Sequence, residues 1–145
     1  MGIIVRHRQS SRIMFYLKGA ETVMQNKVRP NQRASLRESC ETLAMDGLRT
    51  LVISQKLLTE IQYEAFDQRF KRARASLNDR ETLINQAIES IEEDMDYLGV
   101  TGVEDKLQDD VMKTIQTLRS AGIQVWMLTG DKIETAKCIA ISAGL

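Results

Sequence analysis

Three consecutive residues, Thr129, Gly130 and Asp131, combine a hydroxyl, a glycine and a carboxylate in a way that suits phosphate chemistry. They follow residues 125–128, which are apolar without polar alternation, a pattern typical of a strand buried on both faces of a parallel sheet. Helical periodicity begins directly after them. Open α/β sheets bind ligands at the carboxyl ends of their strands, and helix N-termini favour anions. The sequence therefore predicts at least part of a phosphate site, in which Gly130 lets the backbone approach the phosphate.

Asp131 also has a structural interpretation. A carboxylate before a helix can accept N–H bonds from the first turn, and Glu134 stands at the capping-box position. Spacing alone leaves both roles open.

Four further residues are candidates for contact with a ligand. Lys18 ends an alternating strand, from which its ammonium can reach a ligand, and Gly19 keeps the wall of a pocket low. Arg49 offers a fork of donors that suits phosphate, and we expect Lys18 and Arg49 to face one cavity in an intact parent protein. Asp105 follows a predicted strand and would open onto the same sheet edge as Asp131, where two carboxylates can position a divalent ion. The alternatives are a surface lysine at position 18 and a solvated acidic loop around position 105.

The elements expected before residue 97 alternate between strands and helices without a fixed order. A capping-box signal at Asn78 and Glu81 starts the last of these helices. The expected elements are a strand hairpin (3–5 and 13–17), helices at 20–27 and 33–46, a strand at 48–54, a helix at 59–76 and a helix after residue 78.

After residue 97 the pattern becomes β-α-β-α, with strands at 97–103 and 123–128 and helices at 109–121 and 131–143. Short connections predict a parallel strand pair with a right-handed crossover. The predicted fold class is α/β: part of an α+β domain over residues 1–96, followed by a unit of a doubly wound domain over residues 97–145. Both chain ends are expected to be cuts through a larger protein.

Composition narrows the class of protein. The 145 residues are 43% hydrophobic and 28% charged, as in soluble globular proteins. The net charge of zero divides into +6 over residues 1–40 and −6 over residues 41–145. The basic part suits a nucleotide polyphosphate, and equally an ordinary solvated surface.

Several site types are excluded. Cys40 and Cys138 lack C-x-x-C spacing, which argues against a disulfide framework or zinc site, and the single histidine, His7, excludes a His-cluster metal site. No apolar run approaches the roughly 18 residues that cross a bilayer. The basic cluster at residues 71–74 lies on a helix with acids, so no nucleic-acid partner is expected.

Four blocks of this sequence resemble, in order and spacing, motifs of the type IV P-type ATPases, the ATP-driven phospholipid flippases. The first two blocks in chain order are Lys-Gly-Ala, within residues 16–21, and Gly-Leu-Arg, within residues 47–51. They are followed by Val-Glu-Asp-Lys-Leu-Gln at residues 103–108 and by Thr-Gly-Asp, within residues 127–132. The spellings at residues 1–6 and 99–105 resemble the Golgi/endosomal branch.

The resemblance implies an enzyme that uses ATP and Mg²⁺ to form an aspartyl-phosphate. Residues 1–96 would be the end of the nucleotide-binding domain, and residues 97–145 part of the haloacid dehalogenase-like phosphorylation domain. In this resemblance Lys18, Gly19, Arg49 and Asp105 are nucleotide-binding residues. Thr129, Gly130 and Asp131 are catalytic residues: Thr129 contacts the phosphoryl group and Asp131 lies near Mg²⁺.

The family's acceptor motif, Asp-Lys-Thr-Gly-Thr, does not occur in the chain. The resemblance also implies that the parent is an integral protein of the Golgi/endosomal or plasma membrane and works without an accessory subunit. This segment would lie on the cytosolic side. The chain alone is expected to be inactive, and no metal-ligand set is assigned within it. The alternatives are a soluble haloacid dehalogenase-type phosphatase and a non-catalytic nucleotide-binding or interaction fragment.

Overall fold

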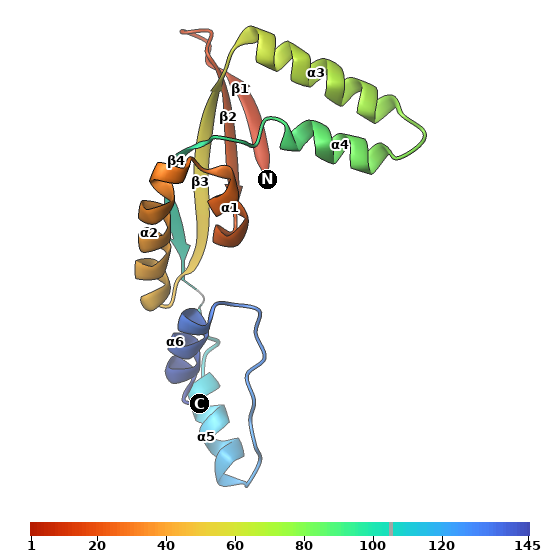
Figure 1. Cartoon of the computed structure of the whole chain (residues 1–145). Coiled ribbons are helices and arrows are strands. Elements are labelled where there is room, and N and C mark those ends of the chain that lie inside the picture. The colour runs from red at the N-terminus through yellow and green to blue at the C-terminus, as the bar shows by residue number, and fades with distance from the viewer. Residues whose placement is uncertain (105) are drawn as a thin grey trace.

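The computed structural model describes residues 1–104 and 106–145, so the candidate residue Asp105 lies outside the described residues. The chain forms a small sheet flanked by helices, with a helical hairpin at one end and a two-helix segment at the other (Figure 1). The elements are β1 (Gly2–Arg6), β2 (Ile13–Gly19), α1 (Glu21–Lys27), the 3-10 helix η1 (Pro30–Gln32), α2 (Arg33–Met45), β3 (Arg49–Leu58), α3 (Glu60–Ala75), α4 (Arg80–Glu89), β4 (Asp96–Val103), α5 (Val111–Ser120) and α6 (Ile133–Ala143).

The sheet has the order β1-β2-β3-β4, and every neighbouring pair is antiparallel. The strand registers determine which residues lie at the end of the sheet nearest α6. Gly19 at the end of β2 pairs with Val52, and Arg49 at the start of β3 pairs with Val103. Arg49 therefore lies at the sheet end nearest the segment after β4 (Figure 1).

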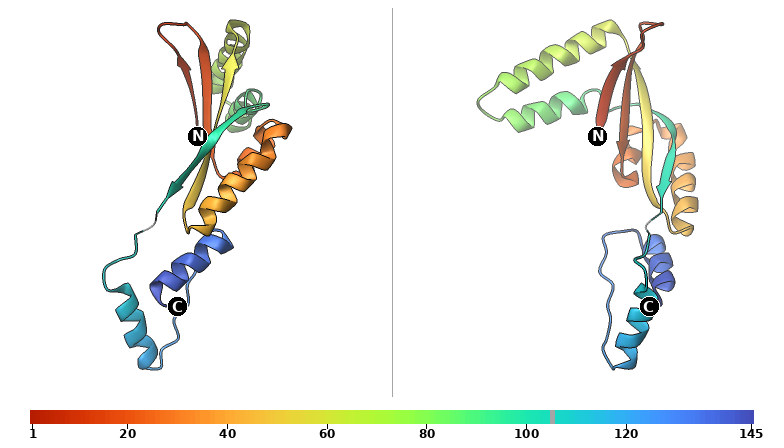
Figure 2. Two further views of the ribbon diagram at one scale, coloured as in Figure 1. Left: turned by 90° about the vertical axis from the view of Figure 1, so that its left-hand side faces the viewer. Right: turned by 180° about the vertical axis from the view of Figure 1, so that it is seen from behind.

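One face of the sheet carries the core. Strand β2 alternates, so Ile13, Phe15 and Leu17 point to the same face and are buried there. Helices α1 and α2 cover that face, which the views from the side and from behind show clearly (Figure 2). The helices contribute Met24, Val28, Leu36 and Cys40 to this core, and the later chain adds Val52, Leu58, Ile91 and Met95.

Helices α3 and α4 form an antiparallel hairpin that projects from the opposite end of the sheet (Figure 1). Helix α3 starts with a capping box in which Thr59 accepts from the Gln62 backbone and the Gln62 side chain accepts from the Thr59 backbone. The capping box expected at Asn78 and Glu81 is wrong. The N-cap of α4 is Asp79, with φ of 53°, and it makes no side-chain cap bond.

The mixed α/β class is confirmed, but the expected parallel strand pair is wrong. Strand β4 forms where a strand was predicted, yet it pairs antiparallel with β3, and residues 123–128 form no strand. A strand needs a hydrogen-bonded neighbour, and among the described residues the edge strand β4 pairs with β3 alone and forms no ladder with residues 123–128. Trp126 is therefore 85% exposed rather than buried. The predicted boundary near residue 96 stays a prediction, although β4 beyond it belongs to the sheet.

Helix α6 packs against the turn between α2 and β3. Gly47 in this turn has φ of +78°, and a Cβ there would come within 2.9 Å of the Cys138 Cβ atom on α6. The Cys138 thiol donates to the Met45 carbonyl over 3.3 Å, and the Thr135 hydroxyl donates to the Leu48 carbonyl over 3.4 Å. A glycine is thus required both by the backbone conformation and by the close approach of α6.

Within the described residues, none of the helices combines the length and the apolar character that crossing a bilayer requires.

Burial predicts which leucines stabilise the fold. Leu36 is 0% exposed in the core, whereas Leu77 is 99% exposed. Leu36→Ala should lower the free energy of unfolding by about 2–5 kcal/mol, because it removes packed atoms and leaves a cavity. The matched variant Leu77→Ala should change it by less than about 0.5 kcal/mol. Urea denaturation followed by circular dichroism measures both, and equal effects would contradict the described core.

Candidate functional site

A hollow of about 550 Å³ lies between the end of the sheet and the turn before α6. Arg49, Gly130 and Asp131, three of the predicted site residues, line it together. Its complete lining is Ala20, Glu21, Thr22, Arg49, Thr50, Leu51, Val103, Gly130, Asp131, Lys132 and Thr135.

An ion pair between Arg49 and Asp131 joins the two sides of the hollow across 82 positions of sequence. Arg49 Nε donates to both carboxylate oxygens, over 3.1 and 3.2 Å, and Arg49 Nη2 donates to Oδ2 over 3.0 Å. This is the bidentate arrangement in which an arginine fork matches a planar anion. The same fork would match a phosphate group.

Thr129 completes this group by bonding to Asp131 twice. Its hydroxyl donates to Asp131 Oδ2 over 3.1 Å, and the Asp131 backbone N–H donates to the Thr129 hydroxyl over 3.1 Å. The N-cap of α6 is Lys132 and it receives no side-chain cap bond, so the capping role considered for Asp131 is not observed. The hydrogen bonds from Arg49, and next the one from the Thr129 hydroxyl, hold the pKa of the Asp131 carboxyl below its usual range.

A second ion pair stands beside the first. Lys132 pairs with Glu21, the first residue of α1, which is 8% exposed. Gln25 donates to the other carboxylate oxygen of Glu21 over 2.8 Å. Glu21 is thus a buried carboxylate with a partner on each oxygen. Burial raises the pKa of the nearby Cys40 thiol, and the negative charge of Glu21 raises it further.

Lys18 and Gly19 do not reach this hollow. Lys18 is exposed and lines a different hollow of about 340 Å³, together with Met1, Ile3 and Ile53. Gly19 precedes the lining residue Ala20, and a Cβ at Gly19 would lie 3.3 Å from the sulfur of Met24. Their roles in nucleotide binding stay predictions, as does that of Asp105.

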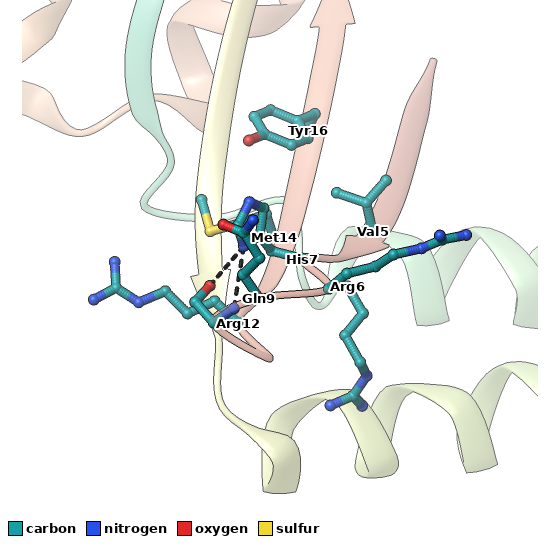
Figure 3. Close-up of a pocket in the computed structure, with 9 residues that line it drawn as sticks. Val5, Arg6, His7, Gln9, Arg12, Met14 and Tyr16 are labelled. Carbon is teal, nitrogen blue, oxygen red and sulfur yellow. Dashed lines mark hydrogen bonds between the residues drawn. The ribbon is translucent and has the colours of Figure 1, made fainter.

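A larger hollow of about 710 Å³ lies at the turn between β1 and β2 and has a different character (Figure 3). Arg6, Arg8 and Arg12 line it, and no carboxylate does. His7 Nδ1 lies 2.9 Å from the Ser10 hydroxyl and accepts from the Ser10 backbone over 3.2 Å. The single histidine therefore holds a turn together.

The described lining of the hollow offers an arginine fork, Arg49, to an anion and a carboxylate, Asp131, to a divalent cation. Among residues 1–104 and 106–145, no three or more His, Cys, Asp or Glu side chains gather as a metal site. Protein-bound Mg²⁺ commonly uses one or two carboxylates and completes its shell with phosphate oxygens and water. Asp131 can supply such a carboxylate once a phosphate takes its place on Arg49.

Sequence reasoning missed Glu21 and Lys132 as a pair. Each is the last residue of a block singled out in the sequence, Glu21 of residues 16–21 and Lys132 of residues 127–132. Their partnership spans 111 positions and depends on how α6 packs against the sheet. The sequence signal available was an acid in the first turn of the predicted helix that follows Gly19.

The chain is similar to known proteins over most or all of its length. The family described as haloacid dehalogenase-like hydrolases matches residues 19–145. The chain is 50% identical, over its whole length, to the probable phospholipid-transporting ATPase IIB of Danio rerio, and covers 13% of that protein. It is 52% identical to the phospholipid-transporting ATPase neo1 of Schizosaccharomyces pombe and 49% identical to NEO1 of Saccharomyces cerevisiae, covering 14% and 12% of them. The chain thus spans about an eighth of the length of these curated relatives.

Removing the arginine fork should raise the pKa of Asp131. Because that pKa is lowered in the folded chain, the ion pair contributes stability above the ordinary carboxyl pKa and loses it as the pH falls through the lowered value. Arg49→Met should move the pKa upward, towards the ordinary value, while the Thr129 bonds remain. Titration of the Asp131 carboxyl carbon by NMR measures this, with Arg69→Met on the exposed face of α3 as control. An unchanged Asp131 titration in Arg49→Met would contradict the pairing.

Proposed function

The chain belongs to the haloacid dehalogenase-like hydrolase family, and from that premise we propose that it is a segment of an ATP-driven phospholipid-transporting ATPase. In this proposal the whole protein forms an aspartyl-phosphate from ATP. The sheet with its helices supplies the nucleotide-binding side, and the segment after β4 supplies one wall of the phosphorylation site.

The contact between Arg49 and Asp131 is the observation that supports this proposal most. An arginine from the nucleotide-binding side lies on the carboxylate of the Thr-Gly-Asp turn, with three donor–acceptor distances between 3.0 and 3.2 Å. A phosphoryl-transfer enzyme has to bring such groups to one place, since its catalysis is mainly positioning and charge stabilisation. The printed names of the relatives add the phospholipid cargo.

Arg49 and the residues of the Thr129–Asp131 turn each have a defined task in this proposal. Arg49 exchanges the Asp131 carboxylate for a phosphate of ATP, because its fork fits either anion. The Thr129 hydroxyl then donates to a phosphoryl oxygen, and Gly130 leaves room for that oxygen beside the backbone. Contacts of this kind strengthen as negative charge develops on the transferring group.

Mg²⁺, when bound, would neutralise charge on the phosphate oxygens, with Asp131 as the ligand that the described residues offer. The acceptor aspartate is not among the 145 residues, because Asp-Lys-Thr-Gly-Thr does not occur in them. The chain therefore prepares the phosphoryl group and its surroundings, and the whole protein supplies the nucleophile.

We further propose the Golgi/endosomal branch, a position of this segment on the cytosolic side of a Golgi, endosomal or plasma membrane, and activity without an accessory subunit. The spellings at residues 1–6 and 99–105 support the branch. The high identity to neo1 and NEO1 supports the same group of transporters.

A soluble phosphatase of the same family is less well supported. That reading gives residues 1–96 no task, and no Asp-x-Asp pair ends a strand in the described chain. A non-catalytic nucleotide-binding fragment remains the description of the chain taken alone.

Arg49 and Thr129 should affect different kinetic parameters in the full-length protein. Arg49→Ala should raise the ATP concentration for half-maximal phosphorylation roughly ten- to a hundredfold, since losing a charge-assisted bond costs about 1.5–3 kcal/mol. Thr129→Ala should instead slow phosphorylation at saturating ATP by about a hundredfold, because its donor acts mainly in the transition state. Rapid-quench measurement of the phosphoenzyme over a range of ATP concentrations separates the two.

Arg69→Ala on the exposed face of α3 is the matched control and should leave both parameters unchanged. A Thr129→Ala enzyme that is phosphorylated at the wild-type rate would remove this residue from the site.

The separate 145-residue chain should form no phosphoenzyme and release no phosphate from p-nitrophenyl phosphate, because it lacks the acceptor aspartate motif. Malachite-green detection of phosphate and an acid-quenched labelling assay with radioactive ATP test both points. Turnover by this chain would favour the soluble phosphatase.

A further inference from the structure

Glu21 is a buried acid to which the proposed reaction gives no task. It is 8% exposed, starts α1, and pairs with Lys132 immediately after the Thr-Gly-Asp turn. Gln25 occupies its second carboxylate oxygen over 2.8 Å. A buried charge is costly unless it is paired and hydrogen-bonded, so this arrangement is stable only while Lys132 stays in place.

The two ion pairs have opposite polarity. On the sheet side Arg49 is positive and Glu21 negative, and on the turn side Asp131 is negative and Lys132 positive. A shift of the turn by one residue would oppose like charges. Like-charge contacts of this kind select against wrong registers. The two neighbouring pairs therefore define a single docking position for the turn.

The pairs differ in exposure, and this difference gives them different tasks. The Arg49 and Asp131 side chains are 51% and 20% exposed, whereas those of Lys132 and Glu21 are 36% and 8% exposed. Water and salt screen the first pair more strongly, so an incoming anion can exchange with it. In the Glu21–Lys132 pair the carboxylate is buried and bonded to Gln25, so we expect this pair to persist when an anion binds Arg49.

We propose that Glu21 is a positioning residue: it holds Lys132, and through it the Thr129–Asp131 turn, at the hollow when a phosphate takes Arg49 from Asp131. This inference rests on the proposed phosphoryl transfer. Without the Glu21 contact, release of Arg49 would also release the turn, and Thr129 would leave the phosphoryl group. A misplacement of about 1 Å can cost about a hundredfold in rate.

The test uses Glu21→Gln, Lys132→Gln, the double variant of both, and the charge exchange Glu21→Lys with Lys132→Glu in the full-length protein. Hydrogen–deuterium exchange of the amides at residues 131–136 reports the docking of the turn. Both single variants should exchange about tenfold faster there. The double variant should be no worse than either, and the charge exchange should recover most of the protection.

Phosphorylation gives the second measurement. Each single variant should slow phosphorylation at saturating ATP about tenfold or more and leave the half-saturating ATP concentration within about twofold. Glu92→Gln is the matched control, since it breaks another partly buried ion pair, with Lys27, away from the hollow. It should leave amide exchange at 131–136 and the phosphorylation rate unchanged.

Three results would overturn the inference. One is wild-type amide exchange in Lys132→Gln, a residue exposed enough for the variant to fold. Another is additive loss in the double variant without recovery on charge exchange. The third is tighter ATP binding in Glu21→Gln with weaker binding in Lys132→Gln, which would make Lys132 a phosphate ligand. A wild-type protein without any phosphoenzyme would end the proposed function instead, and the amide exchange would still test the Glu21 contact.

Discussion

The packing of α6 against the turn between α2 and β3 is the constraint on which the candidate site depends. Gly47 makes that turn with φ of +78° and leaves no space for a side chain beside Cys138. Arg49 follows two residues later at the start of β3. The same close approach that brings α6 to the sheet therefore places the residues before α6 opposite Arg49. Backbone conformation at one glycine thus determines the distance between groups 82 positions apart in the chain.

Two ion pairs then fix the position of the Thr129–Asp131 turn that the packing of α6 brings to the sheet. The bidentate contact of Arg49 with Asp131 is an exposed interaction of modest strength, suited to exchange. The Glu21 contact with Lys132 is more buried and more costly to leave unpaired. In the proposed mechanism, the more buried contact holds the turn while the more exposed one releases Arg49 to the phosphate. The apolar core under α1 and α2 packs the sheet side on which Arg49 and Glu21 stand.

Local patterns were sufficient for most elements and for three of the residues that line the hollow beside the turn. Alternation predicted the strand that buries Phe15, and Gly47 correctly marked the end of α2. Arg49, Gly130 and Asp131 were recognised from residue type and they line one hollow. The sequence could not reveal that residues 123–128 form no strand. An apolar run has the composition of a strand, but it does not show whether a neighbouring strand is there to pair with it. The Glu21–Lys132 pair was missed for a related reason: it depends on long-range packing, which one sequence does not reveal.

The irregular segment before the Thr129–Asp131 turn affects the solubility of the separate chain. Trp126 is 85% exposed, Leu128 is 100% exposed, and Met127 between them is 37% exposed. Short apolar segments without a strand partner favour association between molecules, whatever the stability of the fold that carries them. Residues 125–128 therefore favour association of the separate chain without contributing to its packed core. Resistance to unfolding and resistance to precipitation become two distinct properties of this polypeptide, set by different residues.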